Sequence, residues 1–337
     1  MSPDSIFEEA IRVTPLGANT YAANLRPEWC IGTVAHGGYT TAVLYRMALT
    51  HFEYAHPTHY KEPATPISIQ LSFLRRTAPG AATLVVDDVK LGLRTSTIHI
   101  KVLQKSEKQK NKLEVKIAGY ITVSPASTEV GINAPTGWAL HPASPGGSHP
   151  DGRVNLPVLG RTGRDGVWAR LNTPYPETRQ AESHTEFYTP GSAAMRQHST
   201  GRILGDQWMR FRPGGDPDAR WTNPAVVYVV DMFPMILDGL DSLAAQSMAQ
   251  TDGDESSPDA QFWYPTISLN IDIKKRLPPQ GVEWLYSRVA IKALRDGRTD
   301  LEITVLDEMG DVVALGTQVG LLVSASRNLG SRTKHKL

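Results

Sequence analysis

Hydrophobic and polar residues alternate along two segments of the chain, 66–80 and 266–281, which read PISIQLSFLRRTAPG and TISLNIDIKKRLPPQG. Every second residue in the first half of each segment is apolar: Ile67, Ile69, Leu71 and Phe73, then Ile267, Leu269, Ile271 and Ile273. This period of two is typical of a strand with one buried face. Each segment then reaches basic residues and a Pro/Gly turn, so the same unit is predicted to occur twice.

Further strands are predicted after each of these two segments. The first is followed by TLVVDDVKLG, STIHIKVLQ and KLEVKIAGYITVS, and the second by WLYSRVAIKAL, TDLEITVLD and VVALGTQVGLLVS. Short turns such as 308–311 separate them, which favours hairpins and antiparallel pairing. Each half is therefore expected to form a sheet of about four consecutive strands.

One strongly apolar helix is predicted before each set of strands, over Gly38–Leu49 and Pro224–Leu237. Both segments are apolar nearly all round, as expected of a helix enclosed by its own sheet. A buried helix followed by a curved antiparallel sheet, occurring twice, describes an α+β fold made of two hotdog domains in tandem. Two unrelated α+β domains are the alternative, and the agreement in order and turn chemistry favours the repeat.

The domain boundaries follow from composition. We expect an N-terminal hotdog over 1–124, a Pro/Gly-rich linker over 125–205, a C-terminal hotdog over 206–326 and a basic tail over 327–337. So long a linker is expected to wrap the sheets or to cover a pocket. The TDGDESSPD run within 247–260 is predicted to be a mobile acidic loop.

Charge and composition indicate which binding partners and which cellular location to expect. The chain of 337 residues carries 35 Lys plus Arg against 34 Asp plus Glu, so no broad field favours nucleic acid or a membrane surface. The N-terminal residues do not form a signal peptide and no segment is apolar enough to span a bilayer, so we expect a cytoplasmic protein. The C-terminal His335-Lys336-Leu337 is similar to the peroxisomal Ser-Lys-Leu signal, and an ordinary basic tail is the alternative.

Several catalytic chemistries find no support in the sequence. It has no phosphate-binding Gly-x-x-x-x-Gly-Lys-Ser/Thr motif and no His-Glu-x-x-His zinc motif, and we expect neither a metal nor a cofactor. The segment 146–150, GGSHP, departs from a serine nucleophile elbow. Cys30 is the only cysteine; a small buried residue is its ordinary interpretation and a thiol nucleophile the alternative.

Polar residues within apolar segments indicate where a site lies. Asp231 interrupts AVVYVVDMFPMI, and a buried carboxylate needs hydrogen-bond partners and has a displaced pKa, so it is a candidate general base. A structural Asp that ties helix to sheet is the alternative. Pro234 is expected to kink this helix near the carboxylate.

Gln318 lies between Gly316 and Gly320 on one face of the last predicted strand. Glycine weakens a strand unless a ligand or another backbone needs the space, so Gln318 is a candidate site residue. A bulge with a solvent-facing Gln is the alternative. Thr266 opens the first strand of the second sheet, on the face predicted to include Ser268 and Asn270.

The glycines of His36-Gly37-Gly38 precede the first buried helix. Backbone N–H groups at a helix start can bind the carbonyl or phosphate of a ligand, and a plain tight turn is the alternative.

The sequence resembles the acyl-CoA thioesterase II family, whose members are double hotdogs. The resemblance is carried by QWMRFRPGG, PAVVYVVDMFPMI, PTIS, EWLY and LGTQVGLLVS in the second half, and by GTVAHGGYTTAVLYRM in the first. It implies that Asp231, Thr266 and Gln318 orient a water that attacks an acyl-CoA or acyl-carrier thioester. It further implies substrate contacts from His36, Gly37, Gly38 and Tyr39, and assembly into homo-oligomers.

The chain departs from the family pattern directly after Thr266. Family members have Asp-His followed by aromatic residues there, whereas this strand continues as Ser268, Leu269, Asn270, Ile271 and Asp272. The difference argues against an ordinary fatty acyl substrate and for an unusual or polyketide-like one. A non-hydrolytic hotdog enzyme, such as a dehydratase, lyase or cyclase, and a catalytically silent acyl-binding protein remain as alternatives.

Overall fold

The computed structural model describes residues 5–17, 19–106, 109, 112–191, 196–197, 203–234, 236–237, 239–240, 262–325 and 328. The expected acidic loop at 247–260 and the C-terminal His-Lys-Leu lie outside these residues. Among the described residues, no helix is both long enough and apolar enough to cross a membrane.

The first half of the chain consists of one long helix and an antiparallel sheet. Its elements are α1 (Ile6–Ala10), β1 (Val13–Gly17), β2 (Thr20–Leu25), η1 (Pro27–Trp29), β3 (Cys30–Ile31), β4 (Val34–Ala35), α2 (Gly37–Ala55), β5 (Ala64–Phe73), β6 (Gly80–Lys90), β7 (Ser96–Lys105) and β8 (Leu113–Pro125). Helix α2 is buried along most of its length, which agrees with its apolar sequence on all sides. It is longer than predicted and continues to Ala55.

The second half repeats this plan with a much shorter helix. Its elements are β13 (Ile203–Phe211), η4 (Pro213–Gly215), α4 (Asn223–Val229), β14 (Phe262–Trp263), β15 (Thr266–Ile273), β16 (Trp284–Arg295), β17 (Arg298–Leu306), β18 (Val312–Leu321) and β19 (Val323–Ser324). The strand order β2-β6-β7-β8-β5 in the first half corresponds to β13-β16-β17-β18-β15 in the second. The prediction of a tandem hotdog is confirmed.

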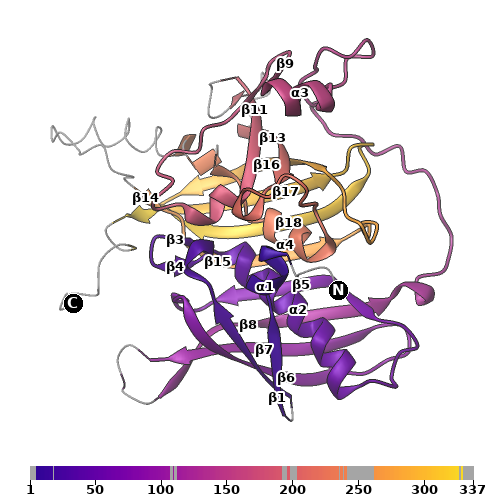
Figure 1. Cartoon of the computed structure of the whole chain (residues 1–337), viewed down its shortest axis with the longest axis vertical. Coiled ribbons are helices and arrows are strands. Elements are labelled where there is room, and N and C mark those ends of the chain that lie inside the picture. The colour runs from indigo at the N-terminus through magenta and orange to yellow at the C-terminus, as the bar shows by residue number, and fades with distance from the viewer. Residues whose placement is uncertain are drawn as a thin grey trace.

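The two halves share one continuous sheet, because β5 pairs with β15 in antiparallel register. Gln70 lies opposite Asn270 and Ile69 opposite Ile271, so the local arrangement is nearly twofold symmetric about this junction. Figure 1 shows β5 and β15 meeting between the purple first half and the orange and yellow second half. Each strand also carries a bulge at the same place in the repeat, between Pro66 and Ser68 in β5 and between Thr266 and Ser268 in β15.

The predicted linker contains more regular structure than its composition suggested. It includes η2 (Ala126–Thr128), α3 (Leu156–Thr162), β9 (Arg164–Asp165), β10 (Trp168–Arg170), η3 (Gln180–His184), β11 (Thr185–Pro190) and β12 (Arg196–Gln197). Strands β11, β10 and β9 extend the second sheet beyond β13. The irregular connector is therefore the stretch from about 129 to 155, and the residues after it cover and lengthen the second sheet.

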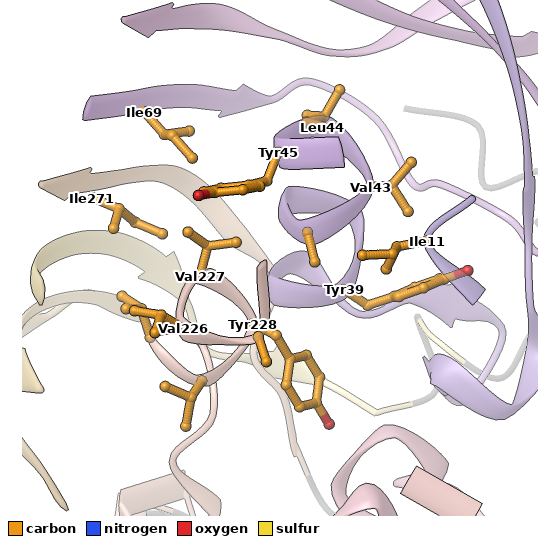
Figure 2. Packing of buried hydrophobic residues seen from close by; sticks show 14 of the residues in the cluster. Ile11, Tyr39, Val43, Leu44, Tyr45, Ile69, Val226, Val227, Tyr228 and Ile271 are labelled. Atoms are coloured by element: carbon orange, nitrogen blue, oxygen red, sulfur yellow. The ribbon is translucent and has the colours of Figure 1, made fainter. Parts of the chain in front are cut away.

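The core lies where α2 and α4 pack together inside the curved sheet. Figure 2 shows Tyr45 of α2 and Val227 of α4 beside Ile69 and Ile271 of the paired strands β5 and β15. All four side chains are buried, and each large apolar side chain contributes roughly 1.5–3 kcal/mol on burial. This core holds the N-terminus of α2 against the C-terminus of α4, which is where the candidate site forms.

Candidate active site

Asp231 lies in a turn directly after α4 and not within a helix, which corrects the prediction of one helix over 224–237. The residue before a proline avoids helical backbone angles, and Pro234 therefore interrupts the helix upstream. The last turn tightens, with the Asp231 N–H donating to Tyr228 O and the Met232 N–H to Val229 O. The turn directs the carboxylate toward α2, and only 7% of Asp231 is exposed.

The start of α2 supplies two polar groups to this carboxylate. The Gly38 N–H donates to Asp231 Oδ2 at 2.7 Å, across 193 residues of sequence. His36, the N-cap of α2, places Nε2 3.4 Å from the same oxygen. The positive end of the helix dipole therefore faces Asp231. The Gly38 N–H was predicted to bind a ligand carbonyl or phosphate. In the structure it donates to a protein carboxylate instead.

Thr266 reaches the site because of the bulge in β15. The prediction that Thr266 shares a face with Ser268 and Asn270 is therefore wrong. Beyond the bulge, Leu269 and Ile271 point inward while Asn270 is exposed, and Ile267 is 40% exposed. Thr266 Oγ1 lies 3.5 Å from Asp231 Oδ1. If the strand ran through Ile267 without a bulge, the period of two would place Thr266 with Asn270 on the outer face.

Gln318 completes the group from the neighbouring strand β18. Its Nε2 donates to Thr266 Oγ1 at 2.6 Å, and only 4% of the residue is exposed. The structure therefore brings together the three side chains that the sequence singled out as catalytic. The solvent-facing alternative for Gln318 is excluded by its burial.

The glycines that flank Gln318 make room for protein atoms. A Cβ at Gly316 would lie 2.6 Å from Val230 Cγ1, and one at Gly320 would lie 2.9 Å from Thr299 Oγ1. These glycines allow the last strand to lie close to α4 and to β17. They do not by themselves form a space for a ligand.

The glycines that open α2 allow close contact with the turn after α4. A Cβ at Gly37 would lie 2.5 Å from Asp231 Oδ2. A Cβ at Gly38 would collide with the backbone oxygen of Tyr228. Side chains at these two positions would separate the N-terminus of α2 from the carboxylate.

Burial controls the charge of the two ionisable groups in the site. It raises the pKa of Asp231, although His36, the Gly38 N–H, Gln318 and Thr266 act in the opposite direction. It lowers the pKa of His36, against the attraction of the carboxylate. A neutral imidazole therefore lies beside a carboxyl group that is easier to protonate than usual.

Two buried polar atoms at the site have no hydrogen-bond partner among the described residues. They are Gln318 Oε1 and His36 Nδ1. Leaving such an atom unpaired costs about 1–3 kcal/mol, and native proteins contain few of them. Their position beside Asp231 favours a polar ligand or a reacting water there.

Tyr39 and Cys30 lie away from this group. The Tyr39 hydroxyl donates to Ala10 O at 2.8 Å and accepts from the Arg26 N–H, and Figure 2 shows its ring beside Ile11. A structural role therefore replaces the predicted substrate contact of Tyr39. Cys30 is 2% exposed, and burial raises its pKa to about 12. Such a thiol is a poor nucleophile, so the thiol alternative has no support.

The chain contains two hotdog units, and a carboxylate, a hydroxyl and an amide meet the N-terminus of a buried helix between them. These features define a double-hotdog protein. Models of the acyl-CoA thioesterase N-terminal and C-terminal domains match residues 25–124 and 150–322. The chain therefore belongs to the acyl-CoA thioesterase family, and the resemblance predicted from the sequence is confirmed.

Similarity to individual proteins agrees with this assignment. The thioesterase-like protein TwmA of Talaromyces wortmannii is 32% identical over 98% of this chain and 95% of its own length. The acyl-CoA thioesterase II TesB2 of Mycobacterium marinum superposes with a TM-score of 0.60 and 16% identity, over 95% of this chain and 99% of that one. The dehydratase domain of RzxB from Pseudomonas fluorescens has the same fold, with a TM-score of 0.50, 10% identity and coverages of 94% and 99%.

Proposed function

We propose that this protein hydrolyses acyl thioesters with a water activated by Asp231, Thr266 and Gln318. The observation that carries the proposal is the continuous polar chain from the Gly38 N–H through the Asp231 carboxylate and the Thr266 hydroxyl to the Gln318 amide. One oxygen of this carboxylate is held by a backbone N–H, and the other accepts the long contact from the Thr266 hydroxyl and keeps a second lone pair that can accept a proton.

The reaction follows from these contacts. A water bound between Thr266 and Gln318 transfers a proton to Asp231 Oδ1 while its oxygen bonds to the thioester carbonyl carbon. The carbon–sulfur bond then breaks, and the departing sulfur takes the proton from Asp231, which leaves a carboxylic acid and a free thiol. The N-terminus of α2 holds the Asp231 carboxylate in position for this transfer through the Gly38 N–H.

The family favours a coenzyme A thioester as substrate, and an acyl-carrier thioester has the same reacting bond. The departure after Thr266 favours an unusual or polyketide-like acyl group over a plain fatty chain. We further propose a cytoplasmic or peroxisomal protein that assembles into homo-oligomers.

The direct test is release of free thiol from a panel of short, long, branched, aromatic and β-hydroxy acyl thioesters. Asp231→Asn should lower hydrolysis by about 100-fold or more, as loss of a general base does. The matched control is Asp272→Asn, a side chain 53% exposed on β15, which should keep wild-type turnover. Near-normal turnover in Asp231→Asn would refute the proposed role.

A second candidate function is supported by the contact between His36 and Asp231, 3.4 Å apart and contributed by different halves. Burial favours a neutral imidazole and a protonated carboxyl group. With a β-hydroxyacyl thioester, His36 would accept the α-proton, a carbon–carbon double bond would form, and Asp231 would protonate the departing hydroxyl to release water. The dehydratase fold similarity is consistent with this reaction.

The two candidates differ in their products and in their dependence on His36. Dehydration gives an enoyl thioester without free thiol, whereas hydrolysis gives free thiol from acyl groups without a β-hydroxyl. His36→Gln should abolish dehydration but only reduce hydrolysis. Ligand-induced stabilisation without either product would indicate a catalytically silent acyl-binding protein.

A further inference from the structure

A second group of polar side chains lies toward the other end of α2. His51 Nε2 is 2.9 Å from Asp88 Oδ1, and His56 Nε2 is 2.9 Å from Asp88 Oδ2. One ligand atom from each of the three residues lies within 4.8 Å of the others. With a rise of 1.5 Å per residue, His51 is about 20 Å along the helix from Gly38, so this group is separate from the candidate active site.

The fold brings these residues together by two local features. Residues five positions apart on a continuous helix point about 140° apart, so His51 and His56 could not meet on an unbroken α2. The helix ends at Ala55, and His56 leaves the helical conformation with φ −130° and ψ 49°. On β6, Asp88 continues the inward-facing series of Leu84 and Val86, which aims its carboxylate at the helix.

We propose that His51, His56 and Asp88 bind a divalent transition metal ion, with Zn²⁺ as the ion that fits best. Two imidazoles and a carboxylate form a set of ligands that zinc accepts at about 2.0–2.2 Å, with water in a fourth position. In a tetrahedral site, ligand atoms at these distances are about 3.4 Å apart. The separations here, 2.9 Å for the His–Asp pairs and at most 4.8 Å overall, span that value.

Tyr21 provides the outer support that such a site requires. Its hydroxyl lies 2.8 Å from His51 Nδ1, and its side chain is fully buried. When His51 donates its Nδ1–H to this hydroxyl, the lone pair on Nε2 faces Asp88. Histidines that bind metals usually donate their second ring nitrogen in this way.

The ligands remain accessible from one side. The His56 and Asp88 side chains are 20% and 24% exposed. His56 also lines a cavity of about 250 Å³ whose other lining residues include Glu53 and Glu62. Lys61 lines the same cavity, so the two carboxylates leave its lining with one net negative charge. A bound ion would join the end of α2 to the C-terminal end of β6, although the sequence alone indicated no metal.

The test is a zinc titration of the full-length protein without an affinity tag, after treatment with a chelator. Calorimetry should show one Zn²⁺ per chain, and zinc should raise the melting temperature. Asp88→Asn and His56→Gln should each weaken binding by at least about tenfold, since even outer-shell changes have effects of this size. Cobalt should give the intense visible absorption of a tetrahedral ion.

Two neighbouring residues serve as matched controls. Asp87→Asn removes the adjacent carboxylate, which pairs with His99 and Lys101 on the outer face of β6. His59→Gln removes a nearby imidazole that contacts Gly92 O. Both should bind zinc as the wild type does. Absence of saturable binding, or equal binding in Asp88→Asn and wild type, would overturn the proposal. Neither result depends on the reaction at Asp231.

Discussion

Asp231 is a carboxyl group whose pKa is raised by burial, and catalysis as a base requires its ionised form. The rate of hydrolysis should therefore rise with pH through this raised pKa, above the ordinary Asp value of about 3.9. A profile of kcat/KM against pH, with the value of Asp231→Asn subtracted at each pH, measures this rise on the acid side. An acid limb at the ordinary Asp value would contradict the assignment.

The raised pKa of Asp231 also affects the stability of the folded protein. A group with a raised pKa in the folded state binds more protons when folded, so its contribution to stability is lost as pH rises from the ordinary to the raised value. The free energy of unfolding of the wild type should thus fall relative to that of Asp231→Asn across this window. Urea unfolding of both proteins at several pH values gives the difference, in which other ionisable groups cancel. A constant difference would exclude a raised pKa.

Gly37 and Gly38 should respond differently to replacement by alanine. The new Cβ of Gly37→Ala displaces the Asp231 carboxylate, a side-chain group, so turnover should fall more than tenfold with stability reduced by about 1 kcal/mol. The Cβ of Gly38→Ala meets the backbone of Tyr228 and should lower stability by several kcal/mol. Thermal unfolding and turnover, measured on both variants, distinguish these effects.

At the scale of the element, the bulge in β15 determines which face carries Thr266. Deletion of Ile267 should remove the bulge and leave Thr266 directly before Ser268, where strict alternation keeps Thr266 on the same inner face as Leu269, so hydrolysis should be largely retained. Ile267→Ser is the control, because an exposed side chain in the bulge contributes little to stability. Loss of hydrolysis with the strand pairing intact would show that the bulge does more than set the face of Thr266.

The elements themselves were largely predictable from the chain. Alternation identified β5 and β15 together with the strands that follow each of them, and the apolar segments identified α2 and the start of α4. The bulges were not predictable, because an extra residue leaves the pattern of apolar positions beyond it unchanged. The end of α4 was missed because the effect of Pro234 reaches back to Val229, several residues earlier.

The candidate site could be predicted only in part. Asp231, Thr266 and Gln318 each stand out locally or by resemblance, and the structure brings them together. The contact of His36 and Gly38 with Asp231 joins residues almost 200 positions apart, and no local pattern encodes such a contact. Tyr39 was misassigned because its place beside two glycines gives no information on where its ring points.

At the scale of the whole molecule, the site requires both halves. Gly38 belongs to the first hotdog and Asp231 to the second, and the β5–β15 junction holds them in register. Chains of residues 1–136 and 137–337, divided in the irregular connector, should therefore associate when produced together and recover activity. Either chain alone should be inactive. Co-purification and thiol release test this, and an active single half would disprove it.

The near-twofold junction relates the candidate site to a second, equivalent corner in the other half, where the corresponding positions hold different residues. Tyr45 takes the place of Asp231, because each lies nine residues after the N-cap of its helix. Pro66 takes the place of Thr266 at the start of the paired strand. Ile121, opposite Ile69, takes the place of Gln318, opposite Leu269. A pair of identical subunits would have to keep both corners alike. Joining the copies in one polypeptide removes that constraint, and the second corner is part of the hydrophobic core. A tight inhibitor should therefore bind with a stoichiometry of one per chain.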